Sequence, residues 1–167
     1  MPAAPAATGS ANPAETLQQE QQAARLLIDV LNQEQALLIA ADIDSLAMVT
    51  ERKGPLVAQM SELATRRHRA LGGRGLPASE AGMQAWIDRK TDGKPADPAA
   101  AAAWTALLAM ARQAQEINRI NGLLINTHMA RNQNALNVLR VQGNSGNFYG
   151  PDGQATNRGM GRGLVVG

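Results

Sequence analysis

Residues 37–46 read LLIAADIDSL, and this stretch decides the fold because it joins two long helical patterns through a short reversal. Asp42 is of a residue type that caps helix N-termini, since its carboxylate accepts a hydrogen bond from a backbone N–H of the first turn. The segment 40–42 is too short for anything except a tight turn. The two helices, expected at about 13–40 and 43–71, must therefore run antiparallel.

Apolar residues recur every seven positions on both sides of this reversal, which is typical of helices that pack in a coiled-coil-like seam. The row before it contains Leu17, Ala24, Leu31 and Leu38, with Ile28 on the same face. The rows after it contain Val49, Leu56, Leu63 and Ala70, and next to them Leu46, Lys53, Met60 and Arg67. Each helix is therefore expected to bury one stripe against the other.

Proline positions set the expected ends and breaks of the helices. Asn12 followed by Pro13 predicts the start of the first helix, because proline is favoured at the first helical position. Gly54-Pro55 predicts a kink in the second helix, or two helices end to end, because a mid-helix proline loses a hydrogen bond. Asp97-Pro98 repeats the capped start, and no further proline occurs before about residue 142.

The remaining segments complete the predicted organisation. Glycines make 71–77 a loop, and Ser79 can cap a short helix at about 80–90 that contains Met83, Trp86 and Ile87. We expect a disordered leader at 1–12, a helical bundle at 13–142 with its last helix at 98–142, and a flexible glycine-rich tail at 143–167. Whether the last helix continues through Gly122 is open at this stage.

Composition supports an all-α chain. Two Trp, one Tyr and one Phe are the only aromatic residues, and Leu, Ala, Gln and Glu, which favour helices, are abundant. We predict an elongated antiparallel bundle of three long helices and one short helix. There is no Cys, no apolar run long enough to span a membrane and no export-signal pattern in the leader, which favours a cytoplasmic location.

The sequence gives little evidence of catalytic or nucleic-acid-binding groups. His68 and His128 have no carboxylate at helical spacing, so surface or packing roles are favoured over catalysis. The run Arg66–Arg69 is interpreted as a solvated helix end, where cations face the helix dipole favourably. Five Arg and one Asp are spread over residues 117–167, which indicates a diffuse basic surface. The sequence therefore predicts no enzyme, no cofactor and no metal site.

The last predicted helix is longer than the others. At about 1.5 Å per residue the first two span roughly 42 Å each, and a continuous last helix spans roughly 67 Å. Its C-terminal part is then without cover from the same chain, and an uncovered apolar face of this size marks a binding surface. The residues of this surface are Leu124, Ile125, Met129, Leu136, Val138 and Leu139.

Polar residues are unexpectedly frequent in the same helix. It contains Asn118, Asn121, Asn126, Asn132, Asn134 and Asn137. They form either a mixed face left in water or a set of amides that fix register with a partner helix. Phe148 and Tyr149, in the glycine-rich tail, have no core to enter, and Tyr is a favoured anchor of protein contacts.

These features, in this order, resemble the FlgN-type flagellar export chaperones. The resemblance rests on AADIDSL at 40–46 leading to Lys53, NRINGLLI at 118–125, NQNALNVL at 132–139 and YGPDG at 149–153. It covers about residues 15–154, and the NGLLI and YGPDG segments are its most specific parts. Gly54-Pro55 departs from the pattern, because relatives have ordinary helix formers there.

The resemblance implies a small cytosolic chaperone of the bacterial type III flagellar export system. It would bind hook-filament junction (hook-associated) proteins, prevent their premature aggregation and deliver them to the export gate. Client binding would fall in the C-terminal part, here Leu124, Ile125, Met129, Asn132, Leu136, Val138 and Leu139. The family's tail tyrosine corresponds to Tyr149, which would dock on the cytoplasmic domain of the gate protein.

Two alternatives stay open on the residues alone. A coiled-coil adaptor could self-associate through the same apolar stripe without any client, so a homodimer is one possible state. A helical protein associated with nucleic acid is less favoured, because the chain lacks the aromatic platforms on which bases stack.

Overall fold

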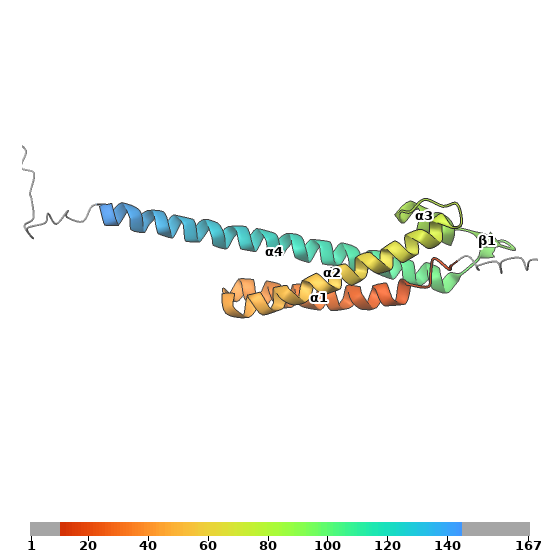
Figure 1. Ribbon diagram of the computed structural model, residues 1–167, viewed down its shortest axis with the longest axis horizontal. Helices are drawn as coiled ribbons and strands as arrows, with labels where there is room; N and C mark the ends of the chain where they lie inside the picture. The colour runs from red at the N-terminus through yellow and green to blue at the C-terminus, as the bar shows by residue number, and fades with distance from the viewer. Residues whose placement is uncertain (1–10, 145–167) are drawn as a thin grey trace, which may run out of the picture. The chain divides into compact units, whose positions relative to one another are not determined.

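The computed structural model describes residues 11–144, which form four helices and one short hairpin (Figure 1). The elements are α1 Leu17–Ala40, α2 Ile43–Gly72, α3 Glu80–Ile87, β1 Lys90–Thr91, β2 Lys94–Pro95 and α4 Pro98–Asn144. The predicted all-α class, with three long antiparallel helices and one short one, is confirmed. Nearly all of the predicted leader and tail lies outside the described residues. No described helix is both long and apolar enough to cross a membrane.

The chain divides into two units, the first ending at Ile125 and the second beginning at Asn126. The first unit contains α1, α2, α3, the hairpin and α4 up to residue 125. The described part of the second unit is the remainder of α4, which runs without interruption through Gly122 to Asn144.

The reversal between α1 and α2 is the predicted tight turn. Asp42 Oδ1 accepts a hydrogen bond from Ser45 N at 3.1 Å, as expected of an N-cap. Two hydrogen bonds from Ser45 hold the pKa of Asp42 below its usual range. The bond from the side chain has the larger effect, and the bond from the backbone N–H the smaller. Ala41 adopts the left-handed conformation with φ 55°, and Asp42 N donates to Leu37 O at 3.0 Å. The chain therefore reverses within two residues.

The register of α1 against α2 is marked by two ion pairs. Arg67 Nε lies 3.0 Å from Glu20 Oε1, and Lys53 Nζ lies 2.8 Å from Glu34 Oε1. Glu20 and Glu34 are fourteen residues apart, as are Lys53 and Arg67, so one antiparallel heptad register satisfies both pairs. Figure 1 shows the two helices side by side over this length.

α1 begins later than the sequence predicted. Asn12 closes a turn instead of capping a helix: its Oδ1 accepts from Ala14 N and its backbone O from Glu15 N, both at 3.0 Å. Residues 13–16 are therefore turns, and the helix starts at Leu17, after Thr16. The Thr16 hydroxyl donates to Glu20 Oε1 at 2.7 Å, so it makes no capping bond to the backbone.

α2 is one helix from Ile43 to Gly72 with Pro55 inside it. The prediction of two helices end to end is therefore wrong. Pro55 and Gly54 are exposed, and the space around Gly54 is open, so the proline ring meets no neighbouring helix. Packing against α1 along most of α2 offsets the lost hydrogen bond.

α3 ends at Ile87, three residues before the predicted end, because the chain enters a hairpin at Lys90. Lys90 pairs with Pro95 and Thr91 with Lys94. Asp92 and Gly93 connect the strands with positive φ angles of 54° and 77°. This is the Asp-Gly pattern of a two-residue type I′ turn.

The core of the first unit has two apolar clusters. The larger is where α3 covers the ends of the long helices, and it contains Leu17, Ala24, Leu71, Met83, Trp86, Ile87, Ala100, Trp104 and Leu107. The smaller joins α1 to α4 and contains Ile28, Leu31 and Ala114. α1 therefore packs against both α2 and α4.

Candidate functional site

The predicted client-binding residues of the second unit lie in water. Met129 is 65% exposed, Leu136 60% and Leu139 63%, and Val138 and Asn132 are exposed as well. At the end of the first unit Ile125 is exposed and Leu124 is half-buried. Exposed large apolar side chains that share a surface are typical of interaction sites.

Helical spacing divides the predicted set. Ile125, Met129, Asn132, Leu136 and Leu139 follow one another at intervals of four and three residues, so they share one face, here called the exposed stripe. Val138 lies two residues after Leu136, about 200° further around the helix. Leu124 is also off the stripe. The exposed Leu123 and Val141, which the sequence analysis did not select, lie towards the side of Val138.

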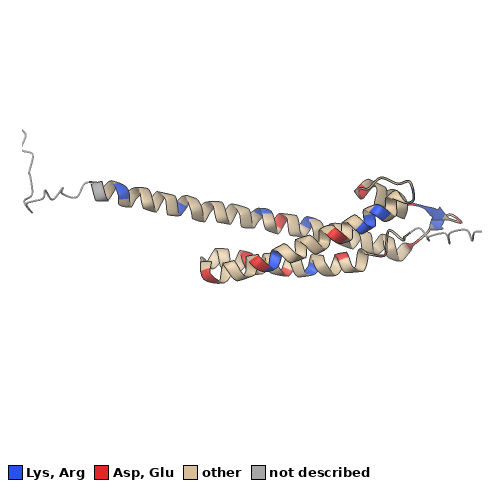
Figure 2. Cartoon of the chain, viewed as in Figure 1, with Lys and Arg blue, Asp and Glu red and all other residues tan. Residues whose placement is uncertain are grey.

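The charge around the stripe has one sign. Within the described residues 126–144 the charged side chains are Arg131 and Arg140, with no carboxylate. Figure 2 shows the contrast along α4, because red appears only in its earlier part. There Arg119 Nη2 lies 2.7 Å from Glu116 Oε1, and hydrogen bonds from this guanidinium lower the pKa of Glu116.

The asparagines of α4 do not share one environment. Asn121 is only 1% exposed, and its Nδ2 donates to Leu31 O at 2.9 Å and to Glu34 Oε2 at 2.8 Å. Asn118, Asn126, Asn132, Asn134 and Asn137 are exposed. Asn121 therefore agrees with the interpretation that these amides fix register with a partner helix, and here that helix is α1 of its own chain.

Glu34 is the centre of the polar cluster that Asn121 completes. Its buried carboxylate also accepts from Lys53 Nζ at 2.8 Å and from Thr50 Oγ1 at 3.5 Å. The cluster therefore ties α1, α2 and α4 together at one level, and it satisfies a charge that would otherwise be costly to bury.

Arg67 corrects the interpretation of the basic run as a solvated helix end. Its side chain is buried, and its Nε and Nη2 bind both carboxylate oxygens of Glu20 at 3.0 to 3.3 Å. The guanidinium also lies over the Trp104 ring at 4.8 Å from the centroid. Arg66 and Arg69 are exposed, as predicted.

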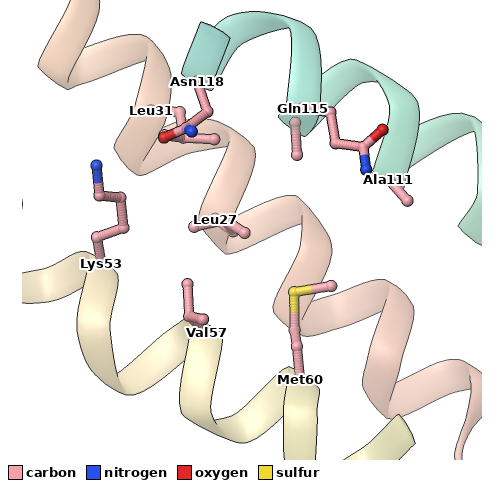
Figure 3. Close-up of a pocket in the computed structure, with 9 residues that line it drawn as sticks. Leu27, Leu31, Lys53, Val57, Met60, Ala111, Gln115 and Asn118 are labelled. Carbon is pink, nitrogen blue, oxygen red and sulfur yellow. The ribbon is translucent and has the colours of Figure 1, made fainter. Parts of the chain in front are cut away.

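A second feature, a groove in the first unit, was not predicted from the sequence. It has a volume of about 390 Å³, and Figure 3 shows side chains from α1, α2 and α4 around it. Its lining residues are Leu27, Leu31, Lys53, Val57, Met60, Ala111, Ala114, Gln115 and Asn118. This α2–α4 groove is mostly apolar, and Val57 on its wall is 51% exposed.

Tyr149, predicted to dock on the export gate, lies outside the described residues, as does Phe148. In residues 11–144 no cluster of three or more His, Asp or Glu side chains is arranged to hold a metal ion.

The family model and the similar proteins found by comparison all carry the same family name. The family model described as FlgN protein matches residues 9–157. The Flagella synthesis protein FlgN of Proteus mirabilis is 32% identical over 128 residues, which cover 75% of this chain and 77% of that protein. Its namesake in Yersinia enterocolitica is 29% identical over 128 residues, with the same coverage. The Flagella synthesis protein FlgN of Yersinia enterocolitica serotype O:8 is 29% identical over 141 residues, which cover 83% of this chain and 86% of that protein.

No solved structure gave a significant match. The family model spans most of the chain, and it covers the helical reversal, the groove and the exposed stripe described above. The family is one of non-enzymatic chaperones. This chain therefore belongs to the FlgN family of flagella synthesis proteins, which are export chaperones.

Proposed function

We propose that this protein is a cytoplasmic chaperone that binds hook-associated proteins, which form the hook-filament junction. It prevents their premature aggregation and delivers them to the flagellar type III export gate. Membership of the FlgN family supports this role. The observation that carries it is the exposed stripe, because Met129, Leu136 and Leu139 lie in water on one helix face.

The stripe suits an amphipathic helix of the client. Such a helix aggregates when its apolar face is open, and it is bound by helix packing through residues spaced three and four apart. Fully burying a Leu or Met side chain contributes about 1.5–3 kcal/mol, so three such residues supply most of a micromolar affinity before ordering costs are subtracted. Asn132 lies among them and would set the register of the bound helix.

Client binding is tested by replacing Leu136 and Leu139 together with Asp. Co-purification with the hook-associated protein should be lost, because the client helix would have to bury two unpaired carboxylates. Val138→Asp is the control, since it adds one of these two charges off the stripe and should leave most of the binding. Circular dichroism should show unchanged helicity in both variants. Full binding by the double variant would refute the assignment of the client site.

Gate docking is a separate part of the proposal, and it rests on the correspondence of Tyr149 with the family's tail tyrosine. The variant Tyr149→Ala should retain the client and show weaker binding to the cytoplasmic domain of the gate protein, with reduced motility. Phe148→Ala is the control for a general loss of an aromatic residue. Normal motility of the Tyr149→Ala strain would remove this assignment.

A further inference from the structure

All sulfur in this chain is in thioether groups, because the sequence contains seven Met and no Cys. Five of the methionines lie in the described residues. Met83 is buried, and Met60 and Met110 are half-buried against the larger core cluster. Met48 on α2 and Met129 on α4 are instead exposed, at 66% and 65%. An oxidant in solution therefore reaches these two sulfur atoms more readily than the other three.

Met129 differs from Met48 in its place on the molecule. It is one of four large apolar side chains on the exposed stripe, and the other three, Ile125, Leu136 and Leu139, are hydrocarbons without sulfur. Met129 lies between Ile125 and Leu136, so a helix bound along the stripe would bury its side chain. Met48 belongs to α2 in the first unit, away from the stripe. The stripe thus contains a single position at which oxidation of sulfur changes its apolar character.

The oxidation needs one reactant, a peroxide. Hydrogen peroxide converts a methionine thioether to the sulfoxide. The sulfur lone pair forms a bond to one peroxide oxygen while the O–O bond breaks, and the second oxygen leaves as water after taking the proton of the first. Sulfur loses two electrons and the peroxide gains them. The product is a polar side chain, where the thioether was soft and apolar.

We propose that Met129 is a redox-sensitive position of the client-binding site, and that its oxidation to the sulfoxide releases the client. This inference rests on the proposed function, and it adds a means of regulating the same surface. The apolar face of a client helix has no donor for the sulfoxide oxygen, so binding would strip that oxygen of its hydrogen bonds to water. Because methionine sulfoxide is reduced again by dedicated reductases, the change is reversible.

Peroxide footprinting of the full-length protein compares the two exposed methionines. Without a client, Met48 and Met129 should form sulfoxide at similar rates, and the buried Met83 should react much more slowly. With the purified hook-associated protein bound, Met129 should be strongly protected, whereas Met48 should stay as reactive as before. Mass spectrometry of proteolytic peptides measures the sulfoxide at each position. Equal oxidation of Met129 with and without the bound client would overturn the proposal.

Affinity measurements test the effect on binding. The protein is treated with hydrogen peroxide, freed of it and mixed with untreated client, so that only its own methionines are oxidised. Wild type should then bind about ten- to a hundredfold more weakly, because an unpaired polar oxygen enters an apolar contact. Incubation with methionine sulfoxide reductase should restore the affinity.

Two leucine variants assign the effect to one sulfur atom. Met129→Leu removes the sulfur and nearly conserves the volume, so it should bind the client before treatment and stay within about twofold of that affinity afterwards. Met48→Leu is the matched control, since it removes an equally exposed sulfur away from the stripe. It should lose affinity on oxidation as wild type does.

The possible failures of the proposal are distinguishable. Oxidised wild type that binds as tightly as untreated protein would remove the redox role of Met129 and leave the proposed function intact. An equal loss of affinity in oxidised Met129→Leu would assign the effect to another methionine, and a loss of helicity by circular dichroism would assign it to unfolding. Untreated wild type that does not bind the hook-associated protein would contradict the proposed function itself, and this inference with it.

Discussion

The two parts of α4 have the same spacing of apolar residues and opposite surroundings. Before residue 125 the helix face that contains Trp104 and Leu107 is buried within the bundle. After it, Met129 and Leu136 continue the intervals of three and four, and they are exposed. Periodicity thus determines which residues share a helix face, whereas the presence of neighbouring helices decides whether that face is core or binding surface. The same substitution should therefore have different effects in the two parts.

The largest difference is expected for charged residues. Arg67→Ala should lower the free energy of unfolding by about 3–5 kcal/mol, because it leaves the Glu20 carboxylate buried without its partner. Arg131→Ala, in the exposed part of α4, should change it by less than about 0.5 kcal/mol. Urea unfolding followed by circular dichroism at neutral pH measures both. Equal effects would mean that the ion pair of Glu20 and Arg67 does not form in solution.

A leucine pair compares the same apolar residue in the two settings. Leu107→Ala should cost about 2–5 kcal/mol of unfolding free energy, since it leaves a cavity in the core. Leu136→Ala should cost less than about 0.5 kcal/mol, because its side chain is already in water. These values refer to dilute protein, where self-association is absent. If Leu136→Ala destabilised the monomer as much, the stripe would be covered within its own chain.

Two asparagines extend the test to polar groups. Asn121→Ala should cost about 1–3 kcal/mol, because Leu31 O and the Glu34 carboxylate each lose a hydrogen bond in a buried site. Asn132→Ala should leave stability nearly unchanged or raise it slightly, since alanine has the higher helix propensity. Thermal unfolding of the two variants beside wild type distinguishes them. A similar loss in both would show that Asn132 is also buried in the free chain.

The sequence predicted what depends on local spacing. The antiparallel reversal at Asp42 and the seven-residue rows follow from residues close to one another in the chain, whereas the continuity of α4 through Gly122 was left open. The seven-residue rows placed Arg67 beside the seam, but its partner Glu20, like the partner of Asn121, Leu31, is far away in sequence, and local spacing does not identify such partners. The hairpin was different, because Asp92-Gly93 is a local pattern that the sequence analysis overlooked.

The smallest effect should come from the reversal itself, where only the first unit is involved. Ala41 has a positive φ of 55°, which L-residues adopt at a cost of about 1–2 kcal/mol and glycine adopts freely. Ala41→Gly should therefore raise the free energy of unfolding by about 0.5–1 kcal/mol, after subtracting the greater flexibility of glycine in the unfolded chain. Because residue 41 is remote in sequence from the stripe, self-association and client binding should not change. A loss of stability on this substitution would show that the turn adopts another conformation in solution, and a change in binding would show that the reversal and the stripe are coupled.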